Sequence, residues 1–189
     1  EMSRGLGDVY KRQILTYMDN QWKAENEFSW SDITGKTNIT ALYPVYPDLD
    51  YIQENLYKNN SLEDILYVKD EFPAGNSIHL QFKHLFSLLT LYLDRDLQTN
   101  LQKIEITCPA VSSIIPKSAE IVPADNETHT TTIAQVSPSG NYSFIVPPVK
   151  NMVIAINMVT NGKKYTTQLE TKSFTGNKEY TYHLKTSEK

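Results

Sequence analysis

The chain contains a single cysteine, Cys108, the first residue to consider for nucleophilic chemistry. One cysteine can form neither an internal disulfide nor a cysteine-based metal cluster. It follows Gln102, Ile104 and Ile106 at a period of two, so we expect its thiol to point inward as a small apolar group. A catalytic cysteine needs a nearby base and a partly exposed, electropositive setting. The next residue, Pro109, indicates only the end of a strand.

The histidines are not spaced as metal ligands. His79 and His84 lie an odd number of positions apart, so a regular strand would place them on opposite faces. Only a bulge between them would let them share a metal ion. His129 and His183 stand alone among threonines and tyrosines. We therefore expect surface histidines and no metal site.

Asp48 and Asp50 could place two carboxylates together, because they are two positions apart. A calcium loop needs more oxygen ligands in a set order and a turn glycine, and this segment lacks them. We interpret both as turn or cap residues, with Asp50 as the N-cap of a helix-like segment over 50–59. The motifs of serine hydrolases, zinc proteases and nucleotide-binding loops are also absent from the sequence. The sequence thus predicts no catalytic residue, no cofactor site, no metal site and no enzyme.

The composition is typical of a folded globular protein and not of a protein that binds nucleic acid. The 189 residues carry a formal net charge of −4, with 40 % hydrophobic and 21 % charged residues. A mildly acidic chain without a Lys/Arg cluster does not match a phosphate backbone. No apolar run reaches the roughly 18 residues of a membrane helix. Four Asn-x-Ser/Thr triplets, at Asn38, Asn59, Asn126 and Asn141, are interpreted as chance and not as glycan acceptors.

Residues 1–13, EMSRGLGDVYKRQ, resemble a translated sequencing adapter. They lack the apolar core of a signal peptide, and we set them aside as a non-native tail. A native polar tail is the alternative. On the first interpretation the native gene begins upstream, so a signal peptide and a lipidation site would lie outside this sequence.

Residues 78–93 form the most informative segment for the fold. Ile78, Leu80 and Phe82 alternate as in a half-buried strand, and the dense apolar run over 85–93 is typical of a strand buried on both faces. The break at Lys83-His84 predicts a bulge where the strand changes partner. Helical spacing also fits part of this segment, so a core helix is the alternative.

The rest of the chain predicts short strands between turn signals. We expect strands at 14–17, 21–23, 38–43, 64–68, 101–108, 128–136, 142–146, 151–159, 165–169 and 180–184. Asn161-Gly162 is the strongest hairpin signal, and 151–159 should be a central strand. Residues 114–122, with Pro116, suit an edge or loop. The turn-rich connector over 71–76 divides residues 14–74, the end of a truncated first β-sandwich domain, from a second sandwich over 75–189. The pattern predicts an all-β, antiparallel β-sandwich.

Two short patterns are typical of one known family. The segment FKHLFS at 82–87 fits F-K-H-x-x-S, and Trp22 and Trp30 flank Phe28. They resemble the F-K-H-x-x-S signature and the paired tryptophan region of the fimbrillin-like family of surface pilins from Gram-negative anaerobes. Further matching segments follow in order: NITALYP at 38–44, DILY at 64–67, VPP at 146–148, GKKY at 162–165 and GNKEYTYHL at 176–184. The last two resemble its closing hairpin. Leu88 and Pro148 depart from the family pattern, which usually has Lys and Gln there.

The resemblance implies transthyretin-like, Greek-key β-sandwich domains, export as a lipoprotein precursor to the outer membrane, and assembly into a fimbrium by strand donation. The partners would be other pilin subunits. The leading hypothesis is therefore a structural or adhesive pilus subunit, or a tip or anchor protein. The alternative is a glycan-binding surface module that uses its tyrosines and tryptophans, although Trp22 and Trp30 could equally be core residues.

Overall fold

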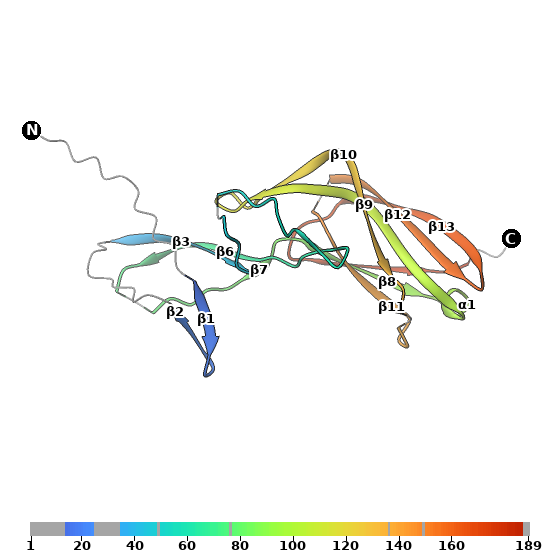
Figure 1. Ribbon diagram of the computed structural model, residues 1–189, viewed down its shortest axis with the longest axis horizontal. Helices are drawn as coiled ribbons and strands as arrows, with labels where there is room; N and C mark the ends of the chain where they lie inside the picture. Colours follow the sequence, from blue (N-terminus) through green and yellow to red (C-terminus); the bar gives the residue numbers. More distant parts are fainter. Residues whose placement is uncertain are drawn as a thin grey trace, which may run out of the picture. The chain divides into compact units, whose positions relative to one another are not determined.

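The computed structural model describes residues 14–24, 35–48, 50–75, 77–135, 137–148 and 150–186. Within these ranges it contains fourteen strands and one short helix (Figure 1). The chain divides into two compact units, Glu1–Asn38 with Glu71–Ile78 and Ile39–Asp70 with His79–Lys189. The residues predicted as a non-native tail, 1–13, lie outside the described ranges. The predicted domain division at 74/75 remains a prediction.

The first unit carries the predicted N-terminal hairpin. Strands β1 (Leu15–Met18) and β2 (Gln21–Ala24) pair antiparallel. Asp19 and Asn20 have φ values of 53° and 60°, which matches the two-residue turn whose twist suits a hairpin. Strands β3 (Lys36–Tyr43) and β6 (Leu66–Pro73) contribute residues to both units. Their ends in the first unit carry the Lys36–Glu71 ion pair at 2.7 Å.

The second unit contains a β-sandwich. One sheet has the order β10-β9-β12-β13, with β9 at Leu101–Ile115, β10 at Glu120–Ile133, β12 at Lys150–Thr160 and β13 at Lys163–Ser173. The other has the order β11-β8-β14, with β8 at Ser87–Leu93, β11 at Asn141–Val146 and β14 at Glu179–Leu184. The all-β antiparallel prediction is confirmed. One pairing departs from it, because β14 runs parallel to β8. The Greek-key connection order remains a prediction.

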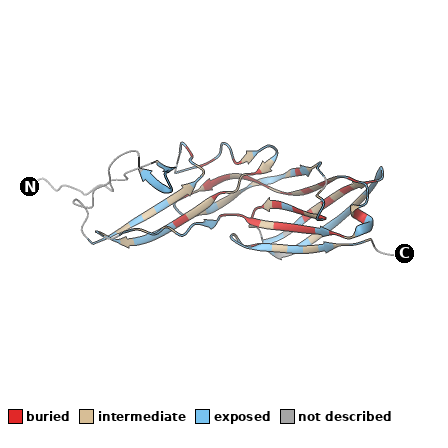
Figure 2. Ribbon diagram, turned by 90° about the horizontal axis from the view of Figure 1, so that it is seen from below, coloured by how far each residue is buried: buried red, intermediate tan, exposed pale blue. Residues whose placement is uncertain are grey.

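The main core lies between these two sheets, and Figure 2 shows buried residues along their strands. Alternate residues of each strand enter it, as a period of two requires. Its members include Leu89, Leu91, Ile104, Ile106, Tyr142, Phe144, Ile154 and Ile156. The central position of β12 and the Asn161-Gly162 hairpin, with φ values of 53° and 72°, are confirmed.

A second buried cluster lies at the C-terminal half of β9. It contains Tyr46, Ile52, Leu56, Leu62, Ile65, Leu85, Phe86, Val111 and Ile114. Three short strands supply or adjoin residues of this cluster. They are β4 (Tyr57–Lys58), which pairs with β5 (Ser61–Leu62), and β7 (Lys83–His84), which pairs with β6. Helix α1 (Arg95–Gln98) is capped at its N-terminus by Asp94, whose carboxylate accepts the Leu97 N–H at 3.0 Å.

The helix-like prediction for 50–59 is wrong. This segment contains a bridge at Ile52, a turn and the start of β4, because its apolar residues follow the surface of β9 and not a helical face. Asp50 is therefore no N-cap. Asp48 instead accepts the N–H groups of Asp50 and Tyr51 at 2.7 and 3.3 Å, and Asp50 pairs with Lys117 at 2.6 Å.

Three other boundaries also differ from prediction. Residues 71–73 continue β6 instead of forming a connector, since pairing in the sheet overrides the local turn signal. Residues 78–82 are not a strand, and the change of partner runs through Lys83–His84, which pairs with β6, to β8, which pairs with β11 and β14. Pro109 does not end its strand, and 114–122 divides between β9, a turn and β10.

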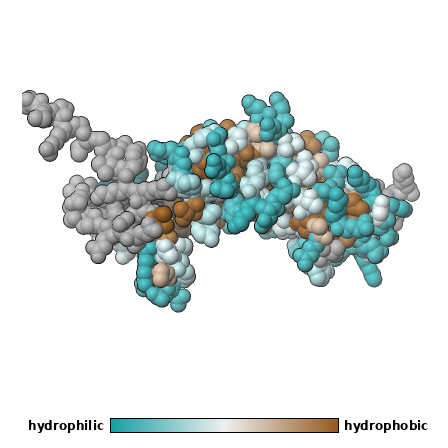
Figure 3. All heavy atoms as spheres, in the orientation of Figure 1, coloured by the Kyte–Doolittle hydropathy of each residue, from teal (hydrophilic) through white to brown (hydrophobic). Residues whose placement is uncertain are grey.

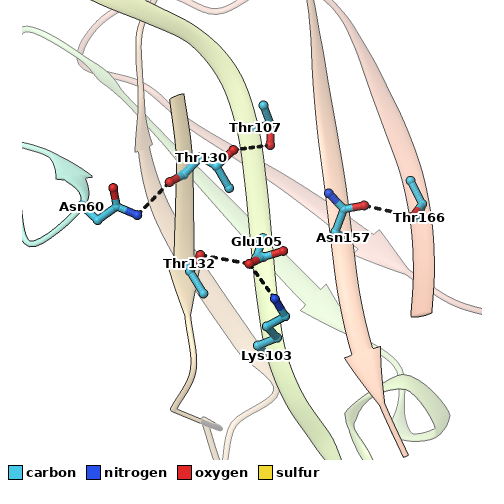
Figure 4. Close-up of polar contacts among 8 residues, drawn as sticks. All are labelled: Asn60, Lys103, Glu105, Thr107, Thr130, Thr132, Asn157 and Thr166. Atoms are coloured by element: carbon cyan, nitrogen blue, oxygen red, sulfur yellow. Dashed lines mark hydrogen bonds and ion pairs between the residues drawn. The ribbon is translucent and has the colours of Figure 1, made fainter. Parts of the chain in front are cut away.

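The outer face of the four-stranded sheet is polar and hydrogen-bonded to itself (Figure 4). Thr107 and Thr130 join across β9 and β10 at 2.7 Å between their hydroxyls. The carboxylate of Glu105 accepts hydrogen bonds from Lys103 at 2.9 Å and from the Thr132 hydroxyl at 3.2 Å, and these bonds lower the pKa of Glu105. In Figure 3 the sandwich strands present a mostly hydrophilic surface with small hydrophobic groups. This is the solvated side that an antiparallel sheet ordinarily has.

Candidate strand-acceptor edge

Strand β9 extends beyond the last residue that pairs with β12. The last β12 partner of β9 is Ala155, opposite Thr107, whereas β9 continues to Ile115. On that side no strand within the described part of the chain pairs with β9 between Cys108 and Ser113. Unpaired backbone groups along a strand are a template for another strand. We call residues 108–113 the free edge of β9.

Residues 50–62, which we call the strap, lie against this free edge. Ile52 and Ile114 form an isolated antiparallel bridge with two backbone hydrogen bonds of 2.9 Å. The hydroxyl of Tyr57 accepts the backbone N–H of Val111 at 2.8 Å. Ile52 and Leu56 are buried in the second cluster. The strap thus covers the edge with side chains and one bridge, and not with a continuous strand.

The strap is also held by contacts to β10 and the turn before it. The side-chain amide of Asn60 donates to the Thr130 carbonyl at 2.9 Å. His129 lies 3.1 Å from the Asn60 carbonyl through Nε2, and its ring lies 4.0 Å from the ring of Tyr57. Lys117 pairs with Asp50 at the other end. These polar contacts are exposed, so we expect each to add little stability.

A small apolar hollow of about 30 Å³ lies beside the free edge. Its lining consists of Pro109, Ala110, Val111, Ile121, Pro123, Pro147 and Pro148. Proline has no N–H to leave unpaired, so it is tolerated where a ladder is incomplete. The ladder of β10 also shifts register around Pro123. The sequence therefore builds an irregular, apolar rim at the place where β9 lacks a neighbour.

Replacing Tyr57 with phenylalanine should destabilise the chain by about 1–3 kcal/mol. The substitution removes the acceptor of the Val111 N–H and leaves that group without a partner at a half-buried position. Urea unfolding measures the loss. Tyr51→Phe is the matched control, since the Tyr51 side chain is 42 % exposed and we expect no more than about 0.5 kcal/mol there. Equal effects of the two variants would contradict this assignment.

The thiol of Cys108 points inward, as the alternation predicts, and is 6 % exposed. Burial raises its pKa to about 11. A neutral, buried thiol lacks the thiolate that nucleophilic chemistry requires. Cys108 is therefore a core residue in this structure.

The pKa of Cys108 predicts a loss of stability in alkali. Its folded pKa of about 11 lies above the ordinary value of 9.0, so the neutral thiol favours the folded state below pH 9 and this contribution disappears as the pH rises to about 11. The maximum is about 3 kcal/mol, since one pKa unit corresponds to about 1.4 kcal/mol. Unfolding free energies of wild type and Cys108→Ala at pH 8 and pH 10.5 test this, because other titrating groups cancel in the difference. Identical pH slopes for the two proteins would refute it.

The histidines lie apart from one another in different contacts. His84 Nδ1 contacts the two Asp64 carboxylate oxygens at 2.9 and 3.0 Å, whereas His79 is exposed outside any strand. His183 stacks on Tyr92 with 5.0 Å between ring centroids. No three potential metal ligands gather among the residues that the structure describes. Nor does any described helix have the length and hydropathy to cross a bilayer.

Of the two tryptophans, only Trp22 lies in the part of the chain that the structure describes. Trp22 is 58 % exposed and faces Tyr17 across the β1–β2 hairpin, with 5.2 Å between ring centroids. Trp30 and Phe28 lie outside the described residues. Among the Asn-x-Ser/Thr triplets, Asn59 and Asn126 adopt positive φ values of 49° and 56°, a conformation that asparagine tolerates in turns.

The family profile of fimbrillin-like proteins matches residues 2–189 of this chain. The chain belongs to the fimbrillin-like family. Membership supports a structural and non-enzymatic protein of the cell surface with a role in pili or adhesion. No curated protein matches the chain in sequence.

Three solved structures of proposed cell adhesion proteins share the fold of this fimbrillin-like chain. The one from Bacteroides ovatus has a TM-score of 0.60 and 16 % identity, over 87 % of this chain and 69 % of its own. The one from Bacteroides uniformis has a TM-score of 0.56 and 12 % identity, over 82 % and 68 %. The one from Bacteroides thetaiotaomicron has a TM-score of 0.55 and 13 % identity, over 91 % and 75 %.

The F-K-H-x-x-S segment of this fimbrillin-like chain connects two strands to a distant turn. The His84 N–H donates to the Asn177 side chain at 3.0 Å, and the Ser87 hydroxyl donates to the Thr175 carbonyl at 2.9 Å. The Asn177 N–H returns a bond to the Phe86 carbonyl at 2.9 Å. Phe86 itself is 1 % exposed. The motif therefore positions β8 and the start of β14, and its roles here are structural.

The segments that resemble the family's closing hairpin separate in the structure. GKKY at 162–165 contains the turn glycine and the first residues of β13 in the four-stranded sheet, and GNKEYTYHL at 176–184 contains a turn followed by β14 in the three-stranded sheet. They are therefore not paired with each other. Sequence reasoning also missed the free edge of β9, whose only local signal was the cluster of prolines at 109, 123, 147 and 148.

Proposed function

We propose that this fimbrillin-like chain is a pilus subunit, or a tip or anchor protein of a pilus, that accepts a strand from a neighbouring subunit at the free edge of β9. The observation that carries the proposal is the end of β12 pairing at Thr107, while β9 continues for another turn-free stretch to Ile115. An incoming strand would gain backbone hydrogen bonds along 108–113 and place apolar side chains near the proline-lined hollow.

The strap already occupies this edge, so a donor strand would have to displace it in order to pair with β9. Its one ladder bridge, Ile52–Ile114, offers fewer backbone bonds than a paired strand of six residues could make. The outer edges of β10 and β13 are the alternative acceptor positions in the same sheet. The hollow is lined by Ile121 and Pro123 of β10 and by no residue of β13, so a strand added at β13 would not contact it.

Hydrogen exchange on the free chain and on the chain recovered from the surface of its native bacterium tests the proposal. We expect the amides of Cys108 and of residues 110–113 to gain protection in the assembled form, while the amides on the outer edge of β13 do not. Protection confined to β10 or β13 would refute the β9 acceptor site. Recovery of the chain as a monomer that never associates would refute assembly altogether.

Membership of the family also supports finer proposals. We propose a location at the outer membrane, export as a lipoprotein precursor, and incorporation into a fimbrium with other pilin subunits. Within the chain, residues 14–74 and 75–189 would be the end of one domain and the whole of the next. Immunogold labelling of intact cells with antibody to this chain tests the location, because label on filaments is expected and an unlabelled surface would contradict it.

A further inference from the structure

The outer face of the sheet β11-β8-β14 carries a hollow that strand donation does not use. It has a volume of about 320 Å³, within the range of small-molecule sites. Leu88 lies opposite Ile145 on one side and Glu179 on the other, so these three residues form one row of the outer face. The hollow lies where β8 and β14 begin and β11 ends.

The hollow combines an apolar floor with a polar rim. Leu88 and Ile145 are half-buried and form the floor. Asp64 and His84 line the hollow as a hydrogen-bonded pair at 2.9 Å, next to residues 177–179, and the His84 N–H donates to the Asn177 side chain at 3.0 Å. One oxygen of Glu179 accepts from Thr90 at 2.7 Å, which fixes the carboxylate and leaves its second oxygen as an acceptor.

The rim offers both donors and acceptors. Lys178 and the side-chain NH₂ of Asn177 are donors, and Glu179 and the Asp64–His84 pair supply acceptors. The rim carries the carboxylates of Asp64 and Glu179 and the single ammonium of Lys178, so its acidic side chains outnumber its lysine. Such a rim disfavours anionic ligands and suits neutral molecules whose edges carry hydroxyl groups and whose faces are apolar, which is the chemistry of a pyranose sugar.

The same outer face continues to an aromatic pair. Tyr92 and His183 lie opposite each other on β8 and β14, with ring centroids 5.0 Å apart and planes 18° apart. Four positions separate Leu88 from Tyr92 along the strand, a span of roughly 13 Å. Between them, the exposed hydroxyls of Ser143 and Thr181 flank Thr90. The face therefore runs from a hollow, past hydroxyls, to an amphipathic aromatic surface.

We infer that the outer face of the sheet β11-β8-β14 binds a short neutral oligosaccharide, with one sugar residue in the hollow and the next residues extending toward Tyr92. This inference is independent of strand donation, since the free edge of β9 belongs to the other sheet. It assigns the exposed Trp22–Tyr17 pair no part in the binding.

A glycan array followed by ¹H–¹⁵N titration of the full chain tests the inference, with maltotriose, cellotriose, mannotriose and N-acetylchitotriose as defined probes. We expect a neutral glycan to shift the amides of 88–92, 143–145 and 177–183, and sialylated analogues to bind more weakly. Glu179→Gln and Tyr92→Ala should each weaken binding by tenfold or more. Thr166→Ala, on the outer face of the other sheet, is the matched control and should leave affinity unchanged.

Three results would overturn the inference. The first is no binding by any glycan on the array at millimolar concentration. The second is binding that survives both Glu179→Gln and Tyr92→Ala. The third is binding that Trp22→Ala abolishes, which would place the sugar on the β1–β2 hairpin. Thermal unfolding of each variant verifies folding, and the exposed Lys178→Ala substitution replaces any variant that fails to fold.

Discussion

Truncation of Phe86 to alanine is expected to destabilise the chain by about 3–5 kcal/mol. The Phe86 side chain is 1 % exposed and packs in the second cluster with Leu85, Val111 and Ile114. Its removal leaves a cavity between the strap region and β9, and close-packed interiors relax only partly around such cavities. Equilibrium unfolding in urea, monitored by tyrosine and tryptophan fluorescence, gives the change in free energy.

Phe82→Ala is the matched control for this prediction. Phe82 opens the same F-K-H-x-x-S segment, but its side chain is 39 % exposed and lies outside any strand. We expect the control to change the free energy of unfolding by about 0.5 kcal/mol or less. A loss at Phe82 as large as the loss at Phe86 would show that the segment is packed differently from this structure.

Replacing Ile52 with alanine is expected to cost about 2–5 kcal/mol and to uncover the free edge of β9. Ile52 is 3 % exposed, and among the described residues its bridge to Ile114 is the only backbone pairing on this side of β9 beyond Thr107. Loss of its side chain should weaken the bridge as well as the packing. Faster hydrogen exchange at the Ile114 amide, together with a lower urea midpoint, would report both effects.

Tyr51→Ala tests whether the second effect belongs to the strap or to any change in this segment. The Tyr51 side chain is 42 % exposed, and its backbone N–H contact with Asp48 persists in the variant. We expect little change in stability and no change in exchange at Ile114. If strand acceptance occurs at β9, Ile52→Ala should also assemble more readily than Tyr51→Ala. Slower assembly of Ile52→Ala would argue that the strap is part of the acceptor site and not its cover.

The fold of the sandwich was largely predictable from local patterns. Asn161-Gly162 specifies a two-residue hairpin because both positions need positive φ, and the structure has this turn. The dense apolar run over 85–93 predicts a strand buried on both faces. In β8 the alternate residues Leu89 and Leu91 fill the core, whereas Tyr92 on the other face is 36 % exposed. The resemblance to the fimbrillin-like family could also be recognised from the sequence, and the family match over residues 2–189 confirms that assignment.

The errors share one cause, which is that local signals compete with contacts distant in sequence. The apolar residues of 50–59 suggested a helix because Ile52 and Leu56 are spaced as on a helical face. They are buried instead against Val111 and Ile114 of β9, which no local pattern reveals. In the same way, Pro109 looked like a strand end, but β9 continues because β10 pairs with it beyond that point.

Most of the strands, the Asn161-Gly162 turn, the inward thiol of Cys108 and the family could be inferred from the order of residues alone. Periodicity and turn chemistry are properties of neighbouring residues, so they can be read in order along the chain. Three features became visible only in the folded chain: β14 pairs parallel with β8, β12 stops pairing with β9 at Thr107, and a hollow forms above Leu88. Strand partners are chosen by burial between segments far apart in sequence, and both candidate sites arise from those choices.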